Sequence, residues 1–293
     1  MTPDGSLLEV AAPSRSFRAD AWRRFRSNKL AIVGTVMVAI LLLVAIFGPF
    51  LVRDPLKIQG RFISKTPPDS HFWFGTDQAG RDVFARVVHG IRFSLFIGFL
   101  VTILESFVGV TLGALAGWYG KWLDAFVMRL VDIFLALPYF ILAVAFIAVL
   151  GRGVTAVVIT LVITSWLTTA RVVRASLMQA KQFDYVEAAK AIGVPTRRII
   201  ARHILPNIIQ PILVLEAIGI GSAVLAEAAL SFLGVGVQEP TPSLGLMISR
   251  SQSFFTEAPG LLYFPGLAIV FTVLAFLLIG DGLRDALDVK DDV

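Results

Sequence analysis

The sequence predicts an all-α, polytopic membrane protein with six transmembrane helices. Hydrophobic residues make up 56% of the 293 residues, and the mean hydropathy is +0.79. Charged residues amount to only 16%, against about 25% in a typical globular protein. A soluble fold of this size would lack the charged side chains that its surface needs. These totals exclude an ordinary soluble enzyme.

Two further totals exclude whole classes of site. The chain has no cysteine, which excludes disulfides, thiolate catalysis and metal sites with cysteine ligands. Its three histidines lie far apart in the sequence, so we expect no metal site. The formal net charge is +5, but in so apolar a chain an excess of Arg and Lys reflects topology and contact with anionic membrane lipid. We therefore expect no nucleic-acid partner.

The first transmembrane helix is predicted at residues 30–52, after a polar and basic tail at 1–29. This apolar run is longer than the ~7–15 residues of the apolar region in a cleavable signal peptide. No small-residue cleavage site follows it. We expect the segment to be a retained membrane span.

Five further apolar runs each reach the ~20 residues that cross a ~30 Å hydrocarbon core. They predict spans near residues 91–118, 123–150, 153–173, 207–235 and 261–282.

The distribution of basic residues sets the orientation. Six Arg and Lys residues precede the first span, which predicts a cytoplasmic N-terminus and, after six crossings, a cytoplasmic tail at 286–293. The segment 171–206 is then also cytoplasmic and holds seven basic residues. The segment 53–92 disagrees, because it is predicted to be external and also holds seven. Reversing the topology would export both the basic tail and the 171–206 segment, so we retain the N-in/C-in assignment.

The extracytoplasmic segment 53–90 is expected to contain an amphipathic helix. Thr76 and Asp77 are suited to cap its start, and apolar residues follow at helical spacing from Val83 to Ile91. A second short helix is expected between the last two spans, after Ser243.

The loop at 174–206 predicts a helical hairpin. Glu187 to Ile192 are mostly good helix formers, and Gly193 is placed to end this helix in a left-handed conformation. Pro195 suits the first turn of a second helix over 196–204. On these residues alone, an ordinary cytoplasmic loop with helical turns is an equal alternative.

Several ordered motifs resemble those of one family. The series Glu187-Ala188-Ala189, Gly193 and Leu205-Pro206 resembles the EAA-type loop of ATP-binding-cassette (ABC) importer permeases. That family has an isoleucine where this chain has His203, and the ending from His203 to Asn207 resembles the dipeptide/oligopeptide/nickel branch. The motifs shared with the C-type permease of that branch cover nearly the whole chain from Trp22 to Asp288, and they are Phe74-Gly75-Thr76-Asp77, Gly80-Arg81-Asp82-Val83, Ser231-Phe232-Leu233-Gly234-Val235-Gly236, Pro240-Thr241-Pro242, Pro265-Gly266-Leu267-Ala268-Ile269 and Gly280-Asp281-Gly282-Leu283-Arg284-Asp285.

The resemblance implies the type I ABC importer permease architecture, with a permease core at 91–285, in the bacterial cytoplasmic (inner) membrane. It implies a heterodimer with a second permease subunit, two ATPase subunits that hold ATP and Mg, and an extracytoplasmic solute-binding protein. No phosphate-binding loop of the G-x-x-x-x-G-K-[ST] type occurs, so we expect no cofactor on this chain itself. The resemblance assigns the contact with the ATPase to the hairpin residues Tyr185, Glu187, Ala188, Ala189, Gly193 and Arg198.

Charged residues within the predicted spans need protein partners, because exposing each to lipid costs at least ~2.5 kcal/mol. Arg129 and Asp132 are three residues apart and are expected to form a structural ion pair on one helix. Glu216 and Glu227 lie about three helical turns apart, near one face. They are candidates to line a translocation path and meet the ammonium group of a peptide, or to contact a partner subunit. Glu105 is a candidate for either role.

Glycines 109, 113 and 117 form a stripe of small residues that predicts close helix packing in the second span.

The preferred function is the permease subunit of an ATP-driven importer for peptides or similar small solutes, without an enzymatic activity of its own. The alternative is a proton-coupled secondary transporter that uses Glu105, Glu216 and Glu227, and it offers no reason for the hairpin. A membrane enzyme is a third alternative, but the sequence has no recognisable set of nucleophile and base. The sequence does not identify the transported substrate, which could be a dipeptide, an oligopeptide, a nickel complex or another small solute.

Overall fold

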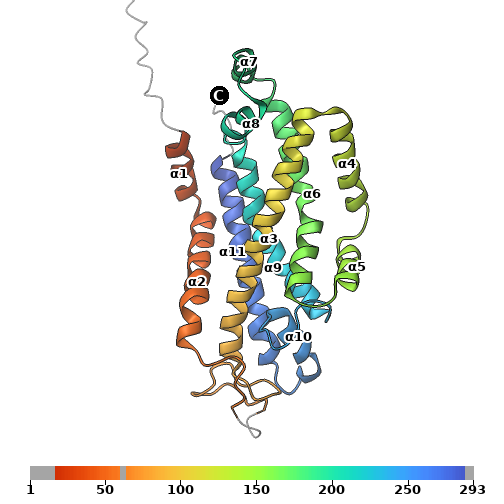
Figure 1. The fold of residues 1–293 in the computed structure, drawn as a ribbon. Coiled ribbons are helices and arrows are strands. Elements are labelled where there is room, and N and C mark those ends of the chain that lie inside the picture. Colours follow the sequence, from red (N-terminus) through yellow and green to blue (C-terminus); the bar gives the residue numbers. More distant parts are fainter. Residues whose placement is uncertain (1–16, 60–63, 288–293) are drawn as a thin grey trace, which may run out of the picture.

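The computed structural model describes residues 17–59 and 64–287, and the regular elements of these residues are helices (Figure 1). Residues 1–16 of the expected N-terminal tail and 288–293 of the expected C-terminal tail lie outside the described residues. The helices are α1 (Phe17–Ser27), α2 (Lys29–Leu51), α3 (Val83–Tyr119), α4 (Lys121–Leu135), α5 (Tyr139–Leu150), α6 (Val154–Ala180), α7 (Asp184–Ala191), α8 (Thr196–Arg198), a π-helical turn (Ile199–Ile204), α9 (Ile209–Phe232), α10 (Leu244–Ser251), a 3-10 turn (Gln252–Phe254) and α11 (Gly260–Leu287).

Five helices in the described part of the chain are long and apolar enough to cross a membrane: α2, α3, α6, α9 and α11. They contain 23 to 37 residues and coincide with the first, second, fourth, fifth and sixth expected spans. These five spans are confirmed as helices.

The third expected span, 123–150, is broken. Its two parts, α4 and α5, meet at an angle of 98° and count as a sixth span only if the bent pair is taken together. Pro138 explains the break, because it has no amide hydrogen to donate and it disfavours a helical conformation at Leu137. The hydropathy of the segment is continuous through this point and therefore did not reveal the break.

The helix expected to start at Thr76-Asp77 instead starts at Val83 and continues into the second span as the single helix α3. The capping residue is Asp82, whose carboxylate accepts hydrogen bonds from the backbone amides of Phe84 (2.9 Å) and Ala85 (3.3 Å). The carboxylate of Asp77 accepts from the backbone amides of residues 79 and 81 and closes a turn. The separate surface helix was therefore a wrong prediction. The short helix after Ser243 is confirmed as α10.

The glycine stripe packs α3 closely against α6. A methyl group at Gly109 would lie 2.8 Å from the Cβ of Thr169, and one at Gly117 would lie 2.9 Å from the carbonyl oxygen of Arg174. At Gly113 it would collide with the backbone of Ala170. The expected packing role of the three glycines is confirmed, with α6 as the partner helix.

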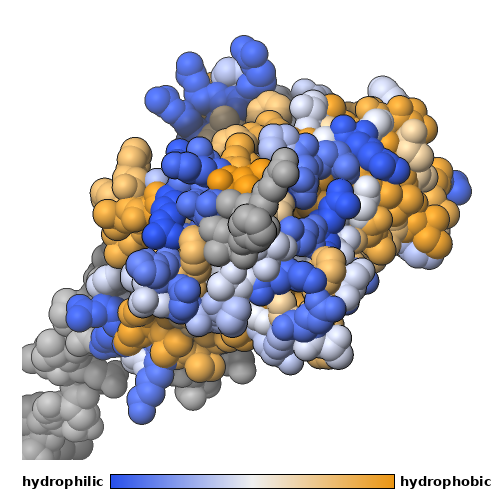
Figure 2. Space-filling model, turned by 90° about the horizontal axis from the view of Figure 1, so that it is seen from below, coloured by the Kyte–Doolittle hydropathy of each residue, from blue (hydrophilic) through white to orange (hydrophobic). Residues whose placement is uncertain are grey.

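The bundle has two distinct ends. The helices α1, α7 and α8 and the C-terminal end of α11 lie at one end, called here the hairpin end (top in Figure 1). The segment before α3 and helix α10 lie at the opposite end, where hydrophilic residues gather between more hydrophobic flanks (Figure 2). The placement of α1, the hairpin and the end of α11 at one end agrees with the expected topology.

Candidate functional site

The expected hairpin is present, and its turn is built on Gly193. Helix α7 ends at Ala191, and Gly193 adopts a positive φ of 77°. The amide of Gly193 donates to the carbonyl oxygen of Lys190, and the amide of Val194 donates to that of Ala189, both at 3.0 Å. These bonds satisfy carbonyl groups that the end of a helix otherwise leaves unpaired. The predicted left-handed helix end is confirmed.

The second arm of the hairpin starts as α8 at Thr196, as expected after Pro195. From Ile199 to Ile204 it widens into a π-helical turn, and the amide of Leu205 donates to the carbonyl oxygen of Ile200 at 2.8 Å. This widening was not predicted from the sequence.

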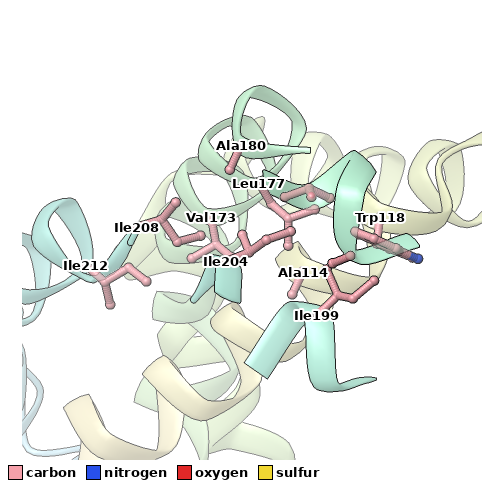
Figure 3. Close-up of a cluster of buried hydrophobic side chains, with 11 residues drawn as sticks. Ala114, Trp118, Val173, Leu177, Ala180, Ile199, Ile204, Ile208 and Ile212 are labelled. Atoms are coloured by element: carbon pink, nitrogen blue, oxygen red, sulfur yellow. The ribbon is translucent and has the colours of Figure 1, made fainter. Parts of the chain in front are cut away.

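A cluster of buried apolar side chains holds the hairpin on the bundle (Figure 3). The hairpin contributes Val186 and Ile204, both 0% exposed, and Ile199, 1% exposed. The cluster, called here the hairpin foot, joins residues of α3, α6, α7, the π-helical turn and the start of α9. Its members are Ala114, Trp118, Val173, Leu177, Ala180, Val186, Ala189, Ile199, Ile204, Ile208 and Ile212.

The opposite face of the hairpin is exposed and forms a crest. Of the six residues assigned to ATPase contact, only Ala189 is buried, and it packs into the hairpin foot. Ile192 is 80% exposed, which is unusual for a large aliphatic side chain at a polar end of the molecule. The crest consists of Tyr185, Glu187, Ala188, Ile192, Gly193 and Arg198.

Trp118, at the C-terminal end of α3, joins the hairpin to the bundle. The ammonium groups of Lys190 on α7 and Lys181 after α6 lie 5.1 Å and 5.3 Å from the centroid of its ring. Lys181 also donates a hydrogen bond of 2.6 Å to the carbonyl oxygen of Trp118. Sequence reasoning missed this residue, because its partners lie more than 60 residues further along the chain.

The three intramembrane glutamates occupy two different environments. Glu227 is 0% exposed, and its carboxylate accepts hydrogen bonds from the hydroxyls of Ser231 and Ser243, both at 2.8 Å, and of Ser94 at 3.5 Å. These serines lie on α9, at the N-cap of α10 and on α3, respectively. Glu227 thereby connects three elements near the end opposite the hairpin.

Glu105 and Glu216 both lie at the junction of α3, α6 and α9. A methyl group at Gly219, one helical turn from Glu216 on α9, would lie 3.3 Å from Oε1 of Glu105. The hydroxyl of Thr169 on α6 donates to Glu216 at 3.4 Å. The sequence placed Glu216 with Glu227 on one helix face, but the structure brings Glu216 together with Glu105 and leaves Glu227 among its serines.

The expected ion pair of Arg129 with Asp132 is not found among the described residues. Asp132 pairs instead with Arg171 of α6, at 2.8 Å. Position 129 lies about 200° around α4 from the buried Val131, so Arg129 points away from α6 and is exposed. The helix α4 is also tied to α6 by the ion pair of Asp124 with Arg174.

Two family models match this chain, one in its C-terminal two thirds and one near its N-terminus. A family model described as "Binding-protein-dependent transport system inner membrane component" matches residues 109–290. A second model, described as "N-terminal TM domain of oligopeptide transport permease C", matches residues 16–68.

Similar relatives cover nearly the full length. The dipeptide transport system permease protein DppC of Alkalihalophilus pseudofirmus is 42% identical over 92% of this chain and 89% of its own length. The oligopeptide transport system permease protein OppC of Bacillus subtilis is 38% identical over 98% and 94%. The glutathione transport system permease protein GsiD of Pectobacterium atrosepticum is 39% identical over 96% and 92%.

These matches include the hairpin and the helices that carry the three glutamates. They give no support to a proton-coupled secondary transporter. The chain therefore belongs to the family of inner membrane components of binding-protein-dependent transport systems, the multi-pass permease subunits of ABC importers.

Proposed function

We propose that this permease subunit serves an importer for peptides or similar small solutes, driven by ATP hydrolysis on separate subunits. The names of its relatives support this substrate class, because dipeptides, oligopeptides and glutathione are all peptidic. The proposal includes a second permease subunit, two ATPase subunits that hold ATP and Mg, and an extracytoplasmic solute-binding protein.

The observation that carries the proposal is the construction of the hairpin. Its crest is exposed, whereas its foot is packed against α3, α6 and α9 through residues such as Ala114, Leu177 and Ile212. A force applied to the crest by a bound ATPase therefore reaches three membrane helices at once. A loop without a mechanical role would have no reason to bury so many side chains against the bundle.

The glutamates have separate proposed roles. Glu105 lines a cavity of about 470 Å³ with residues of α5, α6 and α9, and Glu216 lines another of about 610 Å³ against α3. We place these two carboxylates on the translocation path. Glu227, enclosed by serines, serves as an internal contact of the subunit.

The direct test is ATP-dependent uptake of a radiolabelled dipeptide into proteoliposomes that contain the purified complex and its binding protein. Glu187→Lys reverses a charge on the crest, and we expect it to lower uptake and ATP hydrolysis together. Gln182→Lys, also at an exposed position but outside the crest, is the control and should behave as the wild type. Uptake by wild-type complex that does not depend on ATP, or normal uptake by the Glu187 variant, would contradict the proposal.

A further inference from the structure

Three buried oxygen atoms lack a hydrogen-bond partner among the described residues at the junction of α3, α6 and α9. They are Oγ1 of Thr102, Oε2 of Glu105 and Oε2 of Glu216. The first two residues are 5% and 7% exposed. Buried polar atoms of folded proteins are nearly always paired, so three together require an explanation.

The backbone of α9 allows these side chains to converge. Gly219 faces α3, and a methyl group placed there would lie 3.3 Å from Oε1 of Glu105 and 3.7 Å from Oγ1 of Thr102. Glu216 lies one helical turn from Gly219, and its other oxygen is held by Thr169 at 3.4 Å. Thr102 and Glu216 also line one cavity together, so the three side chains that carry the unpaired oxygens lie around Gly219 between the helices.

This region has two carboxylates and no cation from the described residues. None of the ion pairs found in residues 17–59 and 64–287 includes Glu105 or Glu216. Hydroxyl groups pair with part of each carboxylate, Ser165 with Glu105 and Ser106 and Thr169 with Glu216, but Oε2 of each is left without a partner among the described residues. Glu227 shows the contrast, because both of its carboxylate oxygens accept hydrogen bonds from serine hydroxyls. Burying a carboxylate oxygen without a partner is costly, so the Glu105 and Glu216 site is suited to a group from outside the chain.

The chemistry of the site selects that group. A primary ammonium group carries one positive charge and three N–H donors, which matches three unpaired oxygen acceptors. Charge-assisted hydrogen bonds of this kind are about twice as strong as neutral ones. The cavity of about 470 Å³ that Glu105 lines also has Tyr139, Phe140 and Ser222 on its walls, and it offers space for the rest of a small peptide.

We propose that Thr102, Glu105 and Glu216 form a binding site for a primary ammonium group, and that its natural occupant is the N-terminal ammonium of the transported peptide. The second part rests on the function proposed above. Small inorganic cations share the positive charge but lack N–H donors, and the experiment separates the two.

The test is the melting temperature of the purified permease–ATPase complex with different probes. Methylammonium chloride supplies three N–H donors, tetramethylammonium chloride supplies the charge alone, and sodium chloride supplies an inorganic cation, all at equal ionic strength. Dialanine and N-acetyl-dialanine compare a free with a blocked N-terminus. We expect stabilisation by methylammonium and dialanine, and none beyond the ionic-strength effect by the other three probes.

Variants assign the effect to the site. Glu105→Gln and Glu216→Gln should weaken the apparent affinity for dialanine by roughly tenfold or more, since each removes a charged acceptor. Thr102→Val keeps both charges and the shape of the side chain, so it tests the site even if a Gln variant fails to assemble. Thr160→Val is the matched control, because the hydroxyl of Thr160 is also buried and unpaired but outside the site.

Two results would overturn the inference. One is stabilisation by sodium or tetramethylammonium that equals the stabilisation by methylammonium. The other is an unchanged response to dialanine in all three site variants. Peptide uptake by the wild-type complex is measured in parallel. Stabilisation by methylammonium without any ATP-dependent peptide uptake would refute the proposed substrate and leave the ammonium site standing.

Discussion

Lys190 of α7 lies with its ammonium group 5.1 Å from the centroid of the Trp118 ring at the end of α3. The indole thus forms a direct contact between the hairpin and the longest membrane helix of the described chain, which has 37 residues. Because Trp118 also belongs to the hairpin foot, the same side chain contributes both an apolar and an electrostatic contact.

Trp118→Leu should loosen the hairpin without unfolding the bundle. It removes cation–π contacts worth about 0.5–1 kcal/mol at exposed sites, together with part of the buried aromatic area. We expect amide hydrogen exchange in residues 184–192 to become about fivefold faster, since about 1 kcal/mol corresponds to a factor of this size. Trp122→Leu is the control, because Trp122 is 75% exposed on α4. Equal exchange in the two variants would show that Trp118 does not hold the hairpin.

Gly193→Val should lower peptide uptake and binding-protein-stimulated ATP hydrolysis together. A side chain at this φ of 77° is strained by about 1–2 kcal/mol, although an added Cβ would meet nothing within 4 Å. Gly193→Asn should retain most of the activity, because asparagine tolerates the left-handed conformation. The measurement is ATP hydrolysis stimulated by the loaded binding protein.

Gly266→Val is the control for added bulk, since a Cβ at Gly266 also meets nothing within 4 Å but the residue lies inside α11. If Asn at position 193 is as harmful as Val, bulk at the proposed ATPase contact rather than backbone strain is the cause.

Glu227→Ala should destabilise the subunit. It removes the acceptor of three serine hydroxyls, and each buried group left unpaired costs about 1–3 kcal/mol. We expect the melting temperature in detergent to fall by several degrees, with a smaller decrease for Glu227→Gln, which keeps one acceptor oxygen. Glu257→Ala is the control, because the side chain of Glu257 is 63% exposed. A Glu227→Ala protein as stable as this control would exclude the proposed structural role.

The topology is testable with single cysteines, because the chain has none of its own. Cysteines at positions 14, 190 and 288 should be protected from an impermeant thiol reagent in intact cells, and those at 65 and 252 should react. Labelling at position 190 in unpermeabilised cells would show that the orientation is opposite to the N-in/C-in assignment.

Patterns that depend on neighbours in sequence predicted most of the fold. Hydropathy located five of the spans, the run before Gly193 located the hairpin, and the glycine stripe located a close helix contact. The break at Pro138 had a visible signal, but hydropathy alone does not register the loss of a backbone donor. The capping residue of α3 was misassigned because both Asp77 and Asp82 are good helix caps, and only the tertiary arrangement decides between them.

Contacts between segments that are distant in the chain could not be predicted from the sequence. Asp132 pairs with Arg171 because α4 packs on α6, which an i,i+3 spacing within α4 does not reveal. The spacing of Glu216 and Glu227 on one helix gave no indication that Glu105 would join Glu216 or that three serines would surround Glu227. The sequence therefore predicted which residues belong to the candidate site, but not which of them lie next to one another.

In the proposed function, the crest of the hairpin is the surface that contacts the ATPase. A photo-crosslinking amino acid at position 192 tests it directly, because Ile192 is 80% exposed at the tip of the hairpin. Irradiation of the assembled complex should link the permease covalently to an ATPase subunit, whereas the same amino acid at the exposed position 252, at the opposite end, should not. Absence of any ATPase crosslink from position 192, in a complex that still hydrolyses ATP and transports, would contradict the account.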